Sequence, residues 1–407
     1  MMVSNDVLTD SRVLRHAKSL GRKGHDVIVL GLSSRRTASE EQREHFRIIR
    51  VRLKAYEKLQ SLADGIKERH ARSREFHHGA ADGASATSPP SFLRRFLRKS
   101  SDIAVFVSQL LDTNLTMSEE ARRLDADVYA SNNLDVLLAG AIASGRGGGR
   151  HLVYDAHELW TDMSLQTLRF RAFFYSLEKA LIRKARAVMT VNEFIASELA
   201  RRYDIRTPEV VYNCPERSEI PMNPKRDARI IALYHGVFGS DRGLENLVLS
   251  SKYLDRDVLL LMRGFGEIEA KLRALAYGRE NCQFEDPVPQ NEVIMKAAEA
   301  DVGVVPYLPT NWNNYLCSPN KLFEYIQAGI PVVASDLPFL RKVILGEDIG
   351  LTFNPYDPRD IASTINKVTR EQELTRLKQS VRKAAEKWCW EREEPKLLQI
   401  YDRLEEH

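Results

Sequence analysis

The chain has 407 residues, of which 43% are hydrophobic and 29% charged, as in ordinary globular proteins. Its 60 basic and 56 acidic residues leave a net charge of +4, so the composition gives no indication of a nucleic-acid partner. Because a single core seldom grows beyond about 250 residues, the length predicts two domains.

Export and membrane insertion are not indicated by the sequence. The longest apolar runs fall far short of the roughly 18 residues that a membrane span requires. No apolar stretch follows a basic start at the N-terminus. The cysteines stand at four separated positions, Cys214, Cys282, Cys317 and Cys389. Since they lack paired or metal-ligand spacing, we expect free thiols in a reducing cytoplasm.

Short apolar strands alternate with amphipathic helices along the first half, a pattern typical of parallel sheets covered on both faces. We expect a helix over 10–23, ended by Gly24, and strands at 26–32, 46–53, 128–130, 151–154 and 187–191. The short start, Met1-Met-Val-Ser, leaves the register of a first strand and the true N-terminus open.

A low-complexity stretch at 79–90 predicts a mobile loop. The following residues, 92–99, place Phe and Leu side chains on one helical face and Arg and Lys side chains on another. Such a helix fits the surface of an anionic membrane. Alternatively, the apolar face packs on the first domain and the basic side chains are merely solvated.

Three prolines within residues 213–224 predict a linker at 214–224. The second half then repeats the alternation. We expect strands at 230–234, 258–263, 302–305 and 331–334, and helices over 243–254, 267–277 and 370–406, the last interrupted near Trp388. This organisation predicts domains at 1–213 and 225–385 and a terminal helix at 386–407.

A helix start followed by a carboxylate is the most informative feature of the chain. Ser318 is a good N-cap and Pro319 suits the first helical position. The amides near Asn320 and Lys321 should then point outward, where the helix dipole and the lysine charge favour a phosphate. Glu324 lies on the same helical face and is predicted to accept hydrogen bonds from a ribose diol. Alternatively, the segment is a capped helix with a solvated Lys–Glu pair.

The chain resembles glycosyltransferase family 4 in its donor-site signature, Ser-Pro-Asn-Lys-Leu-Phe-Glu-Tyr-Ile-x-Ala-Gly-Ile-Pro-Val-Val-Ala-Ser at 318–335, and further matches run from Asp10 to Trp390. The resemblance implies an α/β GT-B fold, in which two Rossmann-like domains face each other and a C-terminal helix crosses back to the first. It also implies retaining transfer of a sugar from a nucleotide-diphosphate sugar to a glycan or lipid-linked acceptor, in cell-surface polysaccharide synthesis. The apolar runs and the N-terminus predict a cytoplasmic protein, and the helix at 92–99 predicts a peripheral position on the inner face of the cell membrane.

Two glycine loops of the second half resemble the loops that hold the donor in the family. The expected donor-binding residues are Gly236, Arg242, Arg263, Gly264 and Gly266, together with Ser318, Pro319, Asn320, Lys321 and Glu324. The resemblance assigns the donor diphosphate to Arg242, which precedes a glycine. Val237 stands where the family often has a further arginine, and Arg263 is expected to compensate. Two glycines alone are equally typical of a plain tight turn.

The family pattern has a second glutamate eight positions before Glu324, and this chain has Leu316 there. We interpret the change as altered recognition of the transferred sugar. The preceding residues Asn313, Asn314 and Tyr315 are candidates for the missing hydrogen bonds.

His157 follows the expected strand at 151–154, and ligands gather beyond the carboxyl ends of strands in open α/β sheets. The resemblance gives this histidine a position facing the donor sugar. The predicted catalytic residues are therefore His157, Arg242 and Lys321, and the acceptor-side residues are Asp10, Arg12, Asp155 and Glu158. The plainer alternatives are a structural histidine and, for Asp10, a helix cap.

We predict a reaction without a metal or other cofactor. The leaving diphosphate is stabilised by fixed positive charge. Asp125-Ala-Asp127 precedes a strand instead of following one, so it is not expected to hold Mg²⁺.

Two alternatives stay open. A nucleotide-sugar epimerase of the same fold would bind the donor alike without an acceptor, and the basic helix at 92–99 argues against it. A non-catalytic relative would serve as the partner of another transferase, an idea motivated by Leu316 and Val237. The sequence does not identify the nucleotide base, the sugar, the acceptor or the oligomeric state.

Overall fold

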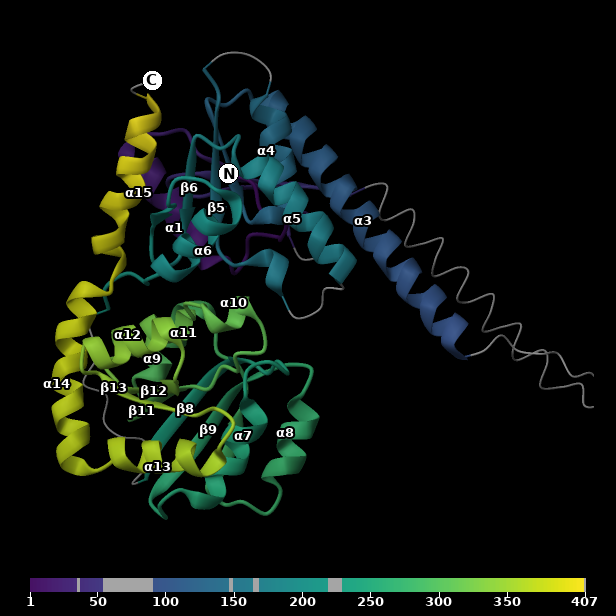
Figure 1. The fold of residues 1–407 in the computed structure, drawn as a ribbon. Coiled ribbons are helices and arrows are strands. Elements are labelled where there is room, and N and C mark those ends of the chain that lie inside the picture. The colour runs from purple at the N-terminus through teal and green to yellow at the C-terminus, as the bar shows by residue number, and fades with distance from the viewer. Residues whose placement is uncertain (35–36, 54–90, 146–148, 164–167, 219–228, 406–407) are drawn as a thin grey trace, which may run out of the picture. The chain divides into compact units, whose positions relative to one another are not determined.

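A computed structural model of the chain describes residues 1–34, 37–53, 91–145, 149–163, 168–218 and 229–405, without the side chains of 91–105 and 168–169 (Figure 1). The loop predicted at 79–90 lies outside these described residues. The basic segment 92–99 belongs to the backbone of helix α3 (Ser91–Leu124), but its side chains also lie outside the description.

Contacts divide the described chain into two compact units, Met1–Asp155 with Lys184–Arg186 and Ala156–Arg183 with Ala187–His407. The linker expected at 214–224 is not a limit of this division, and the domain limits stay a prediction. The predicted fold class is confirmed, because parallel α/β sheets occur in two domains.

In the described residues, the first unit combines helices with short strands that are parallel except for one antiparallel pair. Its elements are α1 (Ser11–Lys23), β1 (Ile28–Leu32), β2 (Glu40–Gln42), β3 (Arg47–Val51), α3, β4 (Val128–Asn132), η1 (Leu134–Val136), α4 (Leu137–Ser144) and β5 (His151–Ala156). One sheet has the order β1-β3-β2, in which β1 and β3 are parallel. Met2 bridges both Leu30 and Ser131, so the first strand is reduced to a single bridging residue.

The second unit begins with η2 (Trp160–Asp162), α5 (Leu168–Ile182), β6 (Ala187–Thr190), α6 (Glu193–Tyr203) and β7 (Glu209–Val210). β6 and β7 are parallel, as β4 and β5 are, and the sheet order is β4-β5-β6-β7. Asn192 caps α6 by accepting from the Ile195 amide, a cap that satisfies an otherwise unpaired N–H of the first turn.

The larger sheet has six parallel strands in the order β10-β9-β8-β11-β12-β13. They are β8 (Ile230–Val237), β9 (Val258–Phe265), β10 (Cys282–Glu285), β11 (Val302–Val305), β12 (Val332–Ser335) and β13 (Gly350–Phe353). The predicted strands at 230–234, 258–263, 302–305 and 331–334 are thereby confirmed. We did not predict the edge strands β10 and β13, which are short and less apolar.

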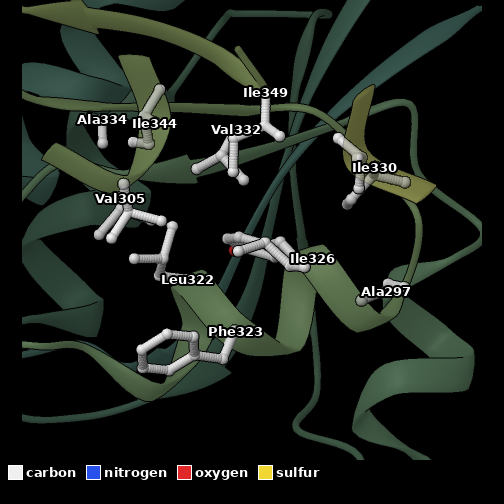
Figure 2. Close-up of a cluster of buried hydrophobic side chains, with 14 of the residues drawn as sticks. Ala297, Val305, Leu322, Phe323, Ile326, Ile330, Val332, Ala334, Ile344 and Ile349 are labelled. Atoms are coloured by element: carbon white, nitrogen blue, oxygen red, sulfur yellow. The ribbon is translucent and has the colours of Figure 1, made fainter. Parts of the chain in front are cut away.

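Both faces of this sheet are buried, as parallel sheets require. Side chains alternate along β8, so that Ile231 and Leu233 enter one core while Ala232 and Tyr234 enter the other. Helix α11 (Asn320–Gln327) covers the first face, where Leu322 and Ile326 lie beside Val305 and Val332 (Figure 2). The helices of the sheet are α7 (Leu244–Ser250), η3 (Ser251–Tyr253), α8 (Glu269–Ala276), η4 (Gln290–Glu292), α9 (Val293–Ala297), α10 (Trp312–Tyr315), α11 (Asn320–Gln327), α12 (Pro338–Gly346) and α13 (Pro358–Val368).

The chain ends in two helices, α14 (Glu371–Lys387) and α15 (Trp390–Glu405), and the predicted interruption at Trp388 is confirmed. Helix α15 contacts the segment around β7: the Tyr212 amide donates to Glu393, and Arg403 donates to Glu209 at 3.0 Å. The terminal helix therefore returns to residues of the first half, as expected.

Candidate functional site

The candidate site forms at the carboxyl ends of β8 and β11 and at the first turn of α11, all within the second unit. β8 and β11 are parallel neighbours, so the loops that follow them leave the sheet at one edge. The loop after β8 carries Arg242, the loop after β11 carries Tyr307, and α11 carries Lys321.

Lys321 is only 8% exposed. Its Nζ donates to the Tyr307 hydroxyl at 3.2 Å and lies 5.1 Å from the centre of the Tyr234 ring. Within the described part of the chain, no carboxylate forms an ion pair with it. A buried charge without a counter-ion is costly, so this arrangement favours a bound anion.

Arg242 lies on the same aromatic ring as Lys321. Its Cζ is 4.2 Å from the centre of the Tyr307 ring, and the Lys321 Nζ is 4.8 Å from that centre. Both distances suit cation–π contacts. Arg242 has partial compensation, because its Nε is 3.5 Å from Asp241, which accepts from Asn314 at 3.0 Å. The two cations predicted for the diphosphate are thus brought together.

Burial changes the pKa values of the groups in this cluster. It opposes the charge of Lys321, but the Tyr307 and Tyr234 hydroxyls favour that charge, and the pKa of Lys321 lies above its ordinary value. Lys321 is therefore a cation near neutral pH. Burial raises the pKa of Tyr234 to about 12, although Lys321 acts to lower it. Burial also raises the pKa of the Cys317 thiol to about 12, which makes it a poor nucleophile at neutral pH.

The predicted glycines allow a close approach between the last residues of β8 and β9, where Gly236 pairs with Gly264, and between the residues that follow them. Gly264 has a φ of 154°, and a Cβ there would lie 1.9 Å from the Gly236 carbonyl oxygen. Gly266 has a φ of 158°, and its Cβ would lie 2.5 Å from the Phe238 oxygen. Loop packing therefore requires both glycines. Their contact with a nucleotide stays a prediction.

Arg263 is held away from the role we expected for it. Its Nε and Nη2 donate to Glu285 at 3.0 and 2.8 Å, and its Nη1 donates to the Lys296 carbonyl at 2.9 Å. These bonds tie β9 to β10 and α9. In this arrangement Arg263 stabilises the sheet and does not stand in for the arginine that Val237 replaces.

The start of α11 differs from the sequence prediction. The helix begins at Asn320 with Pro319 at the N-cap position, and Ser318 Oγ is buried with no hydrogen-bond partner among the described residues. The prediction that Ser318 caps the helix is wrong, because the extended Pro319 takes that position (ψ 132°). The first backbone bond runs from Leu322 to Pro319, so the amides of Asn320 and Lys321 precede it, as expected.

Glu324 contacts a histidine that we did not predict. His235, at the end of β8, has its Nε2 2.7 Å from Glu324 Oε2. The His235 amide donates to the Tyr325 hydroxyl at 3.2 Å, and that hydroxyl donates to the Leu233 carbonyl. The signal in the sequence was a histidine directly before Gly236, at the end of a strand.

His157 follows β5 and is half-buried. Two residues on, the Leu159 amide donates to Asn313 at 2.9 Å. Glu158 lies close enough to Cys317 to act on the pKa of its thiol. The segment of His157 and Glu158 thus lies against the loop that leads into α11, but its catalytic role stays a prediction.

The acceptor-side candidates of the first unit have structural partners. Asp10 caps α1 by accepting from the Val13 amide at 3.2 Å, which is the alternative role given for it above. Arg12 donates to Asp155 at 2.9 and 2.8 Å, and both side chains are buried. His16 Nδ1 lies 3.5 Å from Asp155. The expectation that Arg12 faces the cleft is therefore not supported by its buried position.

The residues around Leu316 are also engaged. Leu316 is buried, and its carbonyl accepts from Asn192 at 2.8 Å. Asn313 and Asn314 hold Leu159 and Asp241, so their amides serve to position loops. Tyr315 is 38% exposed and remains the candidate for contact with the transferred sugar.

A search of the described side chains for three or more His, Cys, Asp or Glu in a metal-binding group finds none. Nor does any helix in the described residues have the length and hydropathy to cross a membrane.

The comparisons with known proteins identify the family. The model of the glycosyl transferase 4-like domain matches residues 9–215, and that of glycosyl transferases group 1 matches residues 230–371. The chain belongs to this family of glycosyltransferases. A search of curated proteins gives no match.

Solved GT-B glycosyltransferases share the fold. Sucrose-phosphate synthase from Thermosynechococcus elongatus aligns with a TM-score of 0.71 at 17% identity, over 97% of this chain and 92% of that one. Anabaena Alr3699/HepE, in complex with UDP and glucose, gives 0.65 at 14% identity over 100% and 98%. WaaG, a glycosyltransferase involved in lipopolysaccharide biosynthesis, gives 0.62 at 14% over 95% and 94%.

Proposed function

We propose that the chain is a retaining, metal-independent hexosyltransferase that moves a sugar from a nucleotide-diphosphate sugar to a glycan or lipid-linked acceptor. The observation that carries this proposal is the buried Lys321, which shares the Tyr307 ring with Arg242 and has no carboxylate partner among the described residues. A diphosphate supplies the missing negative charge.

Each residue has a role in the transfer. As the bond between the sugar and the diphosphate breaks, negative charge grows on the leaving group. Lys321 and Arg242 stabilise this charge from fixed positions, which is the most effective form of electrostatic catalysis. Glu324 accepts from the ribose hydroxyls. His157 faces the donor sugar on the acceptor side, as the family resemblance implies.

Two structural neighbours support the proposed donor and the proposed place of action. HepE was crystallised with UDP and glucose, which supports a UDP-hexose donor. WaaG is involved in lipopolysaccharide biosynthesis, which supports a role in cell-surface polysaccharide synthesis. We propose action in the cytoplasm, at the inner face of the cell membrane, with residues 92–99 on the anionic lipid.

Thermal unfolding tests the donor. UDP-, GDP- and dTDP-sugars are each added at millimolar concentration, and the donor that binds the native chain raises the melting temperature. We expect one base to dominate. No shift with any of the three series would contradict the proposal.

Product analysis then separates the transferase from its rivals. The selected donor, with its sugar labelled, is incubated with membrane extract and also alone. Label in a glycan or lipid fraction, lost in His157→Ala, supports transfer. A new sugar isomer formed without extract identifies an epimerase. If both His157→Ala and Glu324→Ala leave cellular glycan synthesis intact while deletion of the chain abolishes it, the chain is a non-catalytic partner.

A further inference from the structure

His235 and Glu324 form a buried pair between β8 and α11. The Nε2–Oε2 distance is 2.7 Å, and the two side chains are 10% and 15% exposed. A carboxylate only accepts hydrogen bonds, so Nε2 carries the hydrogen of this contact. Bonds to a charged acceptor are shorter and stronger than neutral ones. Glu324 therefore has one oxygen fixed by the imidazole.

The histidine is itself held rigidly. Its ring centre lies 4.6 Å from that of Tyr325, and its amide donates to the Tyr325 hydroxyl. Tyr325 is buried and donates in turn to the Leu233 carbonyl at 3.0 Å. The imidazole thus packs on the Tyr325 ring, while its buried Nδ1 has no hydrogen-bond partner among the described residues. Packing of this kind helps a positioning group to set the orientation of a binding residue.

The pair lies directly beside the cation cluster. Gly236, next to His235, would place a Cβ 3.6 Å from the Lys321 Nζ, and Lys321 is one helical turn before Glu324. A nucleotide whose diphosphate lies on Lys321 brings its pentose toward the carboxylate that His235 holds.

We propose that His235 is a positioning residue for ribose recognition: by fixing Glu324 it makes the site prefer a ribonucleotide over its 2′-deoxy form. This inference rests on the proposed function. It adds that the preference belongs to a pair of residues, because the imidazole of His235 lies on one oxygen of the carboxylate that accepts from the ribose.

The test compares UDP, 2′-deoxy-UDP and inorganic pyrophosphate by calorimetry on the full chain. GDP and 2′-deoxy-GDP replace the uridine pair if GDP binds more tightly. The variants are His235→Phe, which keeps the ring but loses the donor, and His235→Gln, which keeps an N–H at similar reach. We expect the wild type to favour the ribonucleotide about tenfold, the effect of one hydrogen bond to a charged group. His235→Phe should bring this ratio close to one, and His235→Gln should retain most of it.

Two controls separate positioning from folding. Tyr325→Phe removes the hydroxyl under His235 without touching the Glu324 carboxylate, and it should lower the melting temperature with little change in the ratio. Pyrophosphate affinity should stay equal in all four proteins. An unchanged ratio in His235→Phe, or a wild type that binds both nucleotides equally, would overturn this inference alone. Failure of every nucleotide to bind would overturn the proposed function as well.

Discussion

Two buried cations, one in each unit of the chain, are compensated in opposite ways. In the first unit, Arg12 lies against Asp155 with two hydrogen bonds, and both side chains are inaccessible to solvent. In the second, Lys321 is nearly as buried but rests on the rings of Tyr234 and Tyr307. The first cation is neutralised by the fold. The second is left for a ligand to neutralise, and this difference distinguishes a structural ion pair from a binding site.

The largest loss of stability is expected when the carboxylate that pairs with Arg12 is removed. Asp155→Ala leaves Arg12 buried without its partner, which typically costs about 3–5 kcal/mol of stability. Urea unfolding followed by fluorescence measures this loss. Asp26→Ala is the matched control, because Asp26 is exposed and its ion pair with Arg47 is long, at 4.0 Å. We expect this change to cost less than about 1 kcal/mol of stability. If both changes lowered the stability equally, burial would not decide how much an ion pair contributes to it.

Removal of Lys321, which has no ion pair among the described residues, should weaken ligand binding and not the stability of the chain. Lys321→Met keeps the length of the side chain without the charge. We expect nucleotide-diphosphate affinity to fall on the order of 100-fold, the effect of losing one preorganised contact to a charged group. The stability of the ligand-free chain should stay the same or rise, since an uncompensated buried charge is removed.

The exposed Lys271 is the control for this change. It pairs with Glu245 at 3.1 Å on the surface, and Lys271→Met should alter neither property. A marked loss of ligand-free stability in Lys321→Met would show that the lysine is a structural residue, like Arg12.

Substitution of the glycines should destabilise the chain most where the backbone around them is crowded. Gly264→Ala places a Cβ 1.9 Å from the Gly236 carbonyl at a φ of 154°, and we expect a loss of about 2–3 kcal/mol. Gly278 also has a positive φ, 74°, but open space around its Cβ position. Gly278→Ala should therefore cost only about 1 kcal/mol. Similar losses, measured by urea unfolding, would mean that φ and not loop contact decides the cost.

The buried thiols should lower the stability of the chain at alkaline pH, and this effect is smaller than those above. Burial raises the pKa of Cys282 to about 11 and that of Cys317 to about 12, from an ordinary value of 9.0. Their contribution to stability is full below pH 9. It is lost as the pH rises toward the folded values, because only the unfolded chain then releases the protons.

Urea unfolding at pH 8 and pH 10 measures this contribution. Each thiol should contribute a loss of about 1 kcal/mol between the two conditions. Cys317→Ala should reduce the loss relative to the wild type. The same pH dependence in both proteins would show that the thiol ionises as readily in the folded chain.

The sequence predicted what depends on local pattern. Short apolar runs located β8, β9, β11 and β12, and the Ser-Pro-Asn-Lys phrase placed Lys321 at a helix start. The family resemblance assigned Lys321 and Arg242 to one donor site. The sequence did not predict contacts between residues far apart in the chain. The partners of Arg263 and Glu324 come from strands and helices whose neighbours depend on the sheet order, so Glu285 and His235 had no local signal that linked them to these residues.

The role of Ser318 was missed for a different reason. A serine followed by proline fits the sequence rule for a helix start, but the extended Pro319 itself occupies the cap position. The same rule succeeded at Asp10, where no proline competes.

A crystal structure of the chain with UDP, or with the nucleotide diphosphate that the thermal screen selects, tests the central claim most directly. We predict a phosphate oxygen within about 3 Å of the Lys321 Nζ, the distance of a charge-assisted hydrogen bond, with the ribose on Glu324. A diphosphate bound away from residues 318–324, with Lys321 still packed only on its two tyrosines, would contradict the claim.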